Sequence, residues 1–355
     1  MARRKKTTFD TNFLPGLFDD LVLQEGIDAS PEPLKKKGTS PGRPRKINDI
    51  PTTPPEKSEL GIVDGIEPLM PIKPVPQLRF ISFGSGSSGN CSYLGNERFG
   101  ILIDAGVDPT KIYKELERNS IDIKTIGGII LTHDHGDHVS YAYTIVRRNQ
   151  HMRIYCTPAT LNGMLRRHNI SRRIKDYHQP IFQEFPFHLS DFVITPFKVS
   201  HDGSDNVGFF ISAGEHKFVV ATDMGIITDR ADYYMRQANY LMIESNYDLT
   251  MLQNGAYPEY LKARILGERG HMNNDATAAY LKKIFTPSLQ YVFLCHLSHD
   301  NNTPTIALAT TTNALRELNI SVGDGTGSIE SRNASVQVMA LPRFDSTGVI
   351  VLRMP

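Results

Sequence analysis

The sequence predicts an α/β protein in which two mixed β-sheets pack together and helices cover their outer faces. Apolar, β-branched segments alternate with helical segments, and this alternation occurs in two successive blocks of the chain. A length of 355 residues allows one α/β domain of about 250 residues with an extension. The fractions of hydrophobic (40%) and charged (22%) residues exclude a wholly disordered chain and a fibrous repeat.

Residues 1–77 differ in composition from the rest of the chain. They contain more than half of the 22 prolines, and their apolar residues show no sustained period. Such a segment buries too little apolar surface to offset the entropy of ordering its backbone. We therefore predict a largely disordered N-terminal extension over 1–77 and a folded domain over 78–355.

One part of the extension, residues 9–22, has apolar side chains at helical spacing. Two interpretations remain open for it. The segment could be a docking peptide that folds on a protein partner, or it could lie on its own domain.

The first block starts with strands and leads into a helix whose start is encoded locally. Asp108 is a capping residue and Pro109 occupies the first turn, so a helix is predicted from Asp108 to about Asn119. The other elements of this block are strands at 78–83, 91–94, 100–103, 126–132 and 153–156, and helices at 140–148 and 158–168.

The second block begins with three strands that we expect to form a meander, at 192–198, 207–213 and 217–222. Shorter strands and helices alternate after it. They are strands at 241–244 and 291–294, helices at 258–267, 275–284 and 305–318, and a terminal pair of strands at 336–342 and 349–353.

The strongest chemical signal follows the buried strand 126–132. Residues 133–138 contain three imidazoles and two carboxylates, a density that core packing does not explain. Neutral imidazole suits zinc and neighbouring transition metals, and carboxylates can hold a second ion. We expect His133 and His135 to project to one side of a tight loop, and Asp137 and His138 to another, which serves two adjacent metal positions.

Further ligand-type residues follow other predicted strands. Functional groups gather at such strand ends because loops can vary there on a rigid base. These residues are Asp104, His201, Asp223 and His296.

This set, in this order, resembles the metallo-β-lactamase superfamily over about residues 78–355. The resemblance implies a four-layer αββα sandwich with two divalent metal ions, zinc or manganese. It implies that one ion takes His133, His135 and His201, that the other takes Asp137, His138 and His296, and that Asp223 bridges them. It also implies that Asp104 orients a ligand loop by hydrogen bonds.

Residues 84–90, 200–208, 270–274 and 296–302 further resemble the WalJ/YycJ group. That resemblance implies a DNA-acting phosphodiesterase of the 5′-to-3′ exonuclease type. A similarity to tRNase Z places Glu244 and His271 as a pair that assists catalysis.

The chemical requirements of phosphodiester hydrolysis agree with this interpretation. The reaction needs a strong nucleophile, neutralisation of the phosphate charge and a proton for the leaving group. Two metal ions can activate a shared water, and Asp137 is our candidate to accept its proton. His271, oriented by Glu244, is our candidate to protonate the departing oxygen. The structural alternative for His271 is a helix-cap histidine.

Other interpretations stay open at this level. The same metals could hydrolyse a thioester or lactam, or the domain could be a metal-stabilised scaffold that docks a repair partner. The loop 84–90 could offer amides to phosphate or be a plain turn. The basic stretch from Arg147 to Lys175 could follow a DNA backbone or be a solvated face.

Composition also bears on location. The three cysteines, Cys91, Cys156 and Cys295, are scattered and odd in number, which favours reduced thiols in a cytoplasmic protein. No run of about 18 apolar residues is present, so we expect no membrane-spanning helix.

Overall fold

The computed structural model describes residues 77–325 and 328–353. The predicted extension up to residue 76, with its candidate docking segment 9–22, lies outside the described residues. Within the described ranges, no helix is long and apolar enough to cross a membrane.

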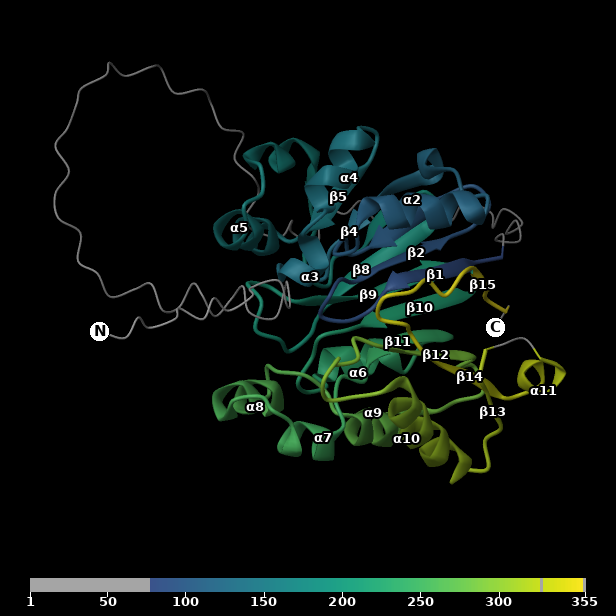
Figure 1. Ribbon diagram of the computed structural model, residues 1–355. Helices are drawn as coiled ribbons and strands as arrows, with labels where there is room; N and C mark the ends of the chain where they lie inside the picture. Colours follow the sequence, from purple (N-terminus) through teal and green to yellow (C-terminus); the bar gives the residue numbers. More distant parts are fainter. Residues whose placement is uncertain (1–76, 326–327, 354–355) are drawn as a thin grey trace, which may run out of the picture.

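Two β-sheets form the middle of the molecule and lie face to face (Figure 1). The first has seven strands in the order β15-β1-β2-β3-β4-β5-β6, and the second has eight in the order β13-β14-β12-β11-β10-β9-β8-β7. The first sheet consists of β1 (Arg79–Gly84), β2 (Cys91–Gly95), β3 (Gly100–Ile103), β4 (Ile126–Ile130), β5 (Arg153–Cys156), β6 (His178–Pro180) and β15 (Ile350–Val351). The second consists of β7 (Phe187–Leu189), β8 (Phe192–Lys198), β9 (Val207–Ala213), β10 (His216–Ala221), β11 (Tyr240–Glu244), β12 (Tyr291–Cys295), β13 (Val322–Gly323) and β14 (Val336–Ala340).

Helices cover the outer face of each sheet, above and below in Figure 1. The first sheet is covered by α2 (Pro109–Arg118), α3 (Gly136–Val139), α4 (Ala142–Arg148) and α5 (Pro158–Arg167). The second is covered by α6 (Asp229–Met235), α9 (Asn274–Ile284) and α10 (Pro304–Arg316). Between β11 and α9, α7 (Leu249–Asn254) and α8 (Glu259–Leu266) have a small apolar cluster of their own. Short α11 (Ile329–Arg332) and the 3₁₀ helices η2 (Ile123–Thr125) and η3 (Arg172–Tyr177) complete the elements. The predicted four-layer αββα arrangement is confirmed.

The alternation of side chains along each strand explains why both faces of the sheets are apolar. In β1, Phe80 points into the cluster between the sheets, whereas Ile81 and Phe83 point into the cluster under the helices. In β10, Phe218 belongs to the cluster between the sheets and Val219 to the cluster beneath the second sheet. Full burial of one such side chain contributes about 1.5–3 kcal/mol.

Local signals placed several elements correctly. The Asp108 side chain accepts a hydrogen bond from the amide of Thr110 at 2.7 Å, and α2 starts at Pro109 as predicted. The predicted meander is confirmed, because β9 pairs antiparallel with both β8 and β10.

Two expectations need correction. Asp137 and His138 do not lie in a tight loop, since they belong to the helical turn α3. The two terminal strands are not partners: β14 pairs with β12 in the second sheet, whereas β15 pairs with β1 in the first. A long-range pairing of this kind leaves no local trace in the sequence.

Candidate active site

The ends of several strands meet at one edge of the sandwich. β3 and β4 run parallel, as do β10, β11 and β12, and β8 has the direction of β10 because both are antiparallel to β9. Their carboxyl ends therefore face the same side of the molecule. The residues found there are Asp104 after β3, His133 after β4, His201 after β8, Asp223 after β10, Glu244 at the end of β11 and His296 after β12.

Three of these positions have left-handed backbone conformations that residues other than glycine rarely adopt. The φ angles are 60° at Asp104, 52° at Asp223 and 55° at His296. Asp104 and His296 directly follow a strand, and Asp223 is the second residue after β10. Such conformations cost of order 1–3 kcal/mol and concentrate at functional sites.

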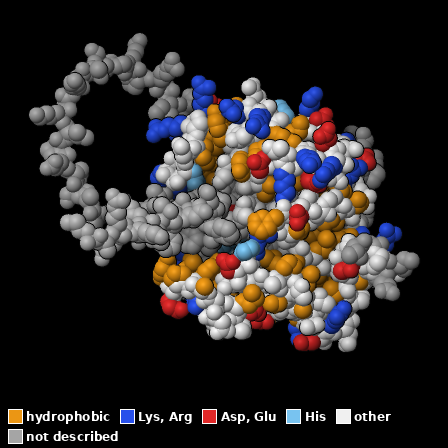
Figure 2. Space-filling view, viewed as in Figure 1, with side chains coloured by type: hydrophobic (Ala, Val, Ile, Leu, Met, Phe, Trp, Pro, Cys, Tyr) orange, Lys and Arg blue, Asp and Glu red, His pale blue; other side chains and the backbone are white. Residues whose placement is uncertain are grey.

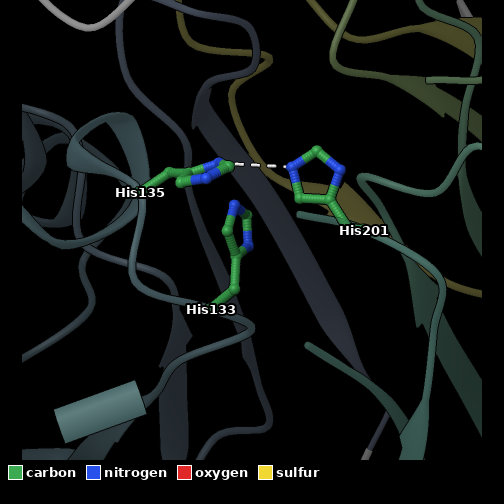
Figure 3. Close-up of side chains that lie close together, drawn as sticks. All are labelled: His133, His135 and His201. Carbon is green, nitrogen blue, oxygen red and sulfur yellow. Dashed lines mark hydrogen bonds between the residues drawn. The ribbon is translucent and has the colours of Figure 1, made fainter. Parts of the chain in front are cut away.

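His133, His135 and His201 converge from two loops (Figure 3). Nε2 of His201 lies 3.2 Å from Nδ1 of His135, and the three residues can each offer a ring nitrogen within 4.8 Å of the others. Nε2 of His133 is buried and has no hydrogen-bond partner among the described residues. A buried nitrogen lone pair of this kind is what a metal ion requires.

Asp137, His138 and His296 form a second group of the same kind. Oδ2 of Asp137 lies 3.3 Å from Nε2 of His296 and 3.5 Å from Nε2 of His138. Asp223 lies between the two groups: its Oδ2 is 3.4 Å from Nε2 of His138, and its Oδ1 is 3.8 Å from Nε2 of His201. The Asp223 carboxylate thus faces both groups at once.

The remaining ring nitrogens of four histidines are held by hydrogen bonds, which orients each ring. These contacts join Nδ1 of His133 to Thr132 at 3.0 Å, Nδ1 of His138 to Asp104 at 2.8 Å, Nδ1 of His201 to the Gly270 carbonyl at 3.1 Å and Nδ1 of His296 to Glu244 at 2.9 Å. In each case Nε2 is left on the side of the ring that faces the cluster. Metal-binding histidines in proteins usually have this second partner, so the donor set fits a pair of divalent cations.

The electrostatics of the cluster favour positive charge at its centre. Burial alone would raise the pKa of Asp223, but neighbouring imidazoles, His296 above all, hold it well below its ordinary value. Burial would lower the pKa of His138, yet the surrounding carboxylates, Asp223 first, raise it to about 9. Burial prevails at His201 and lowers its pKa to about 4, which keeps that imidazole neutral.

Glu244 is fully buried, and its carboxylate accepts four hydrogen bonds. Oε1 accepts from Nδ1 of His271 at 2.7 Å and from Nδ1 of His296 at 2.9 Å. Oε2 accepts from the amides of Met224 at 2.9 Å and Met272 at 3.1 Å. The sequence paired Glu244 with His271, and its contact with His296 was missed because it depends on β11 and β12 being neighbours.

His271 does not cap a helix, so that alternative is wrong. The N-cap of α9 is Asn273, whose side chain accepts from the amide of Ala276. Because Nδ1 of His271 donates to Glu244, Nε2 is on the opposite side of the ring. The His271 side chain is 16% exposed and lines a cavity together with His296.

This cavity is partly open to solvent. Its lining combines polar groups at the strand ends with apolar groups from the helical segment around α8. Tyr257, Leu261 and Ile265 represent the second kind.

The Gly/Ser loop 84–90 is hydrogen-bonded to residues of the cluster. Asn90 donates from Nδ2 to Oδ2 of Asp137 at 3.1 Å, and its own Oδ1 accepts from the Gly86 amide at 2.8 Å. Oγ of Ser85 accepts from the His296 amide at 2.9 Å. The amides of residues 85, 86, 89 and 90 all donate within the protein, so these four are not available to phosphate.

Asp134 is a further supporting residue that sequence reasoning left unassigned. It is fully buried, and it accepts hydrogen bonds from the amide and the hydroxyl of Ser204 at 2.8 and 2.7 Å. These bonds join the loop that carries His133 to the loop that carries His201. The sequence indicated Asp134 only by its place within residues 133–138. That place does not distinguish a metal ligand from a residue that joins two loops by hydrogen bonds.

Every residue predicted for the site therefore lies in this one cluster. A model of the β-lactamase superfamily domain matches residues 100–296, a span that contains every predicted metal ligand.

Two curated relatives resemble most of the chain. Exodeoxyribonuclease YycJ of Bacillus anthracis is 30% identical over 253 residues, which cover 70% of this chain and 92% of YycJ. Exodeoxyribonuclease WalJ of Streptococcus pneumoniae serotype 2 is 29% identical over 246 residues, which cover 69% of this chain and 91% of WalJ.

Solved structures agree on the fold. The metallo-β-lactamase fold protein YhfI of Bacillus subtilis has a TM-score of 0.54 at 16% identity, over 76% of this chain and 98% of YhfI. At that identity the likeness bears on the fold alone. The family match, the relatives and the donor set together lead to one conclusion: the chain belongs to the β-lactamase superfamily and is a metal-dependent hydrolase similar to YycJ and WalJ.

Proposed function

We propose that this protein is a metal-dependent nuclease that hydrolyses DNA from its ends in the 5′-to-3′ direction. The observation that carries the proposal is the Glu244–His271 pair, with its 2.7 Å hydrogen bond, beside a cluster of imidazoles and carboxylates. The names of YycJ and WalJ, both exodeoxyribonucleases, support DNA as the substrate.

In this proposal the cluster holds two divalent cations, zinc or manganese. His133, His135 and His201 hold one, Asp137, His138 and His296 hold the other, and Asp223 lies between them. When bound, such a pair lowers the pKa of a shared water and neutralises charge on the phosphate.

The chain's own groups move the protons. The Asp137 carboxylate is ionised, because neighbouring imidazoles hold its pKa well below the ordinary value against the effect of burial. It is the proposed acceptor of the proton that the attacking water loses. As the phosphorus–oxygen bond to the leaving nucleotide breaks, His271 donates a proton from Nε2 to the departing oxygen. Glu244 keeps the His271 ring in place throughout, since its Oε1 holds Nδ1–H.

The test uses the full chain with manganese or zinc and linear DNA labelled at its 5′ end. Early release of labelled mononucleotide is expected for the wild-type protein, and none for Asp137→Ala. Asp176→Ala, which removes an exposed carboxylate, is the matched control and should retain activity. Thioester or lactam turnover without DNA cleavage, under every metal tried, would favour the alternative hydrolase.

Two broader proposals accompany this one. We propose that residues 1–77 form an extension to a catalytic domain over 78–355, with residues 9–22 as a docking segment for a protein partner. We also propose a cytoplasmic location, since the described cysteines Cys91, Cys156 and Cys295 are buried free thiols.

A further inference from the structure

Residues 245–273, between β11 and α9, form a helical segment that lies beside the candidate active site. The segment contains α7 and α8 and has an apolar cluster of its own, with Tyr247, Leu252, Leu261 and Ile265 buried in it. This cluster is separate from the three clusters that fill the four layers. The conformation of the segment is therefore stabilised by its own apolar contacts, and not by packing against the two sheets.

The segment is nevertheless tied to the predicted metal ligands. Nε of Arg264 in α8 donates to Oδ2 of Asp202 at 2.7 Å, and Oδ1 of Asp202 lies 3.3 Å from Nε2 of His135. Just after α8, the Gly270 carbonyl lies 3.1 Å from Nδ1 of His201. α8 is thus held at a fixed place beside the cluster. In Figure 1, α3 and α5 lie above the sheets and α7 and α8 below them, all toward the left end of the sheets.

The cavity between this segment and the strand ends has two unlike walls. Leu261, Ile265 and Tyr257 line it from the segment, together with Arg264, whose guanidinium is paired with Asp202. His271 and His296 line it from the candidate active site. An apolar and aromatic wall next to polar groups suits a nucleobase, which has apolar faces and polar edges.

We propose that this cavity binds the nucleoside at the end of a DNA strand and that the ring of Tyr257 stacks on the terminal base. In this proposal Leu261 and Ile265, which line the cavity, stop the strand so that it does not continue beyond that nucleoside. The phosphodiester next to it then lies beside His271. The inference rests on the proposed nuclease function and gives a physical reason for cleavage at strand ends.

The first experiment compares Tyr257→Ala with Tyr260→Ala in the full-length protein. Tyr260 also belongs to the α8 region, but it is 58% exposed and does not line the cavity, so it is a matched control. Linear DNA and bis(4-nitrophenyl) phosphate, a small diester without a nucleoside, are the substrates. We expect Tyr257→Ala to lower the ratio of kcat/KM for DNA to kcat/KM for the small diester by about 5- to 150-fold, mainly through KM.

Tyr257→Phe keeps the ring and loses only the hydroxyl, which donates to Asp300 at 2.8 Å. It should restore most of the ratio. Equal ratios for Tyr257→Ala and Tyr260→Ala would overturn the inference, as would cleavage of circular single-stranded DNA at the rate of linear DNA. If the wild-type protein hydrolyses neither substrate, the proposed function fails, which is a different result.

A second measurement needs no variant. Inhibition of bis(4-nitrophenyl) phosphate hydrolysis by thymidine 3′-monophosphate is compared with inhibition by deoxyribose 3-phosphate, which lacks the base. A site for the terminal nucleoside predicts an inhibition constant at least about 5-fold lower for the nucleotide. Equal inhibition by the two compounds would overturn the inference.

Discussion

The side chains at the strand ends and those of residues 245–273 line one cavity, but they are held in place differently. The strand-end groups are buried and hydrogen-bonded on their outer sides, as Glu244 shows with four contacts. The helical segment depends on a small apolar cluster around Leu252 and on the Arg264–Asp202 ion pair. The difference indicates that the rigid sheets position the charged groups. In the proposed function, the substrate is selected by the helical segment, whose apolar cluster is separate from those of the sheets.

The largest expected effect lies at the junction of the two regions. His271→Ala removes the proposed proton donor, so kcat should fall by about 10²–10⁴-fold. The metal content measured by elemental analysis should not change, because His271 belongs to neither proposed set of metal ligands.

His299→Ala is the control for this variant, since the His299 side chain is 52% exposed and contacts Asp300 at 2.7 Å. It should leave kcat unchanged. A wild-type kcat in His271→Ala would remove His271 from the proton transfer.

The free energies of unfolding of two core variants, one in each region, show whether the two regions are stabilised separately. Leu252→Ala should cost about 2–5 kcal/mol, since Leu252 is fully buried in the apolar cluster of the segment. We expect the amides of α7 and α8 to lose protection from hydrogen exchange while metal content is retained. Leu294→Ala, in β12 next to His296, should cost a similar amount but lower the metal content as well. An equal decrease of metal content in both variants would show that the two regions are not separable.

Asp104→Ala tests the outer support of the strand ends. Asp104 lies 2.8 Å from Nδ1 of His138 and accepts from the Thr132 amide at 2.8 Å, so its removal frees one ring and one loop. Metal affinity should fall by about 10–100-fold, as for other partners of ligating histidines. Competition with a chelator measures this, and Asp122→Ala, an exposed helix cap, is the matched control. Unchanged affinity would mean that the sheets alone orient His138.

The strand-end groups could be predicted from the sequence because their signal is local. Residues 133–138 carry a high density of ligand-type side chains, Asp104 and His296 come directly after an apolar strand, and Asp223 is the second residue after one. Resemblance to a known family supplied the grouping of the ligands and the four layers, which composition and periodicity alone do not give.

The helical segment could not be predicted in the same way. The predicted helix at 258–267 corresponds to α8, but α7 has six residues and was missed. The cavity forms because Tyr257 and Ile265 lie near residues of the loops that follow β11 and β12, such as Asn246 and His296, and that is a tertiary relation. The Glu244–His296 contact and the hydrogen bond between Asp134 and Ser204 could not be predicted for the same reason, because they join residues far apart in the sequence.

The smallest expected effect concerns a surface away from both regions. Arg147, Arg148, Arg172 and Arg173 are exposed on the helical layer of the first sheet. Lys and Arg side chains gather over that part of the face shown in Figure 2. These residues can be tested for contact with a DNA backbone. If an arginine pairs with a phosphate, its replacement should reduce the magnitude of the slope of log K, the DNA association constant, against log salt concentration by about 0.7–0.9.

Binding of DNA to Asp137→Ala at several salt concentrations measures this slope, with and without the added changes Arg172→Gln and Arg173→Gln. Arg316→Gln, exposed at the end of α10, is the control for a general decrease of positive charge. A slope that Arg172→Gln and Arg173→Gln leave unchanged would identify these arginines as a solvated face. DNA would then be held by the cavity and the strand ends without them.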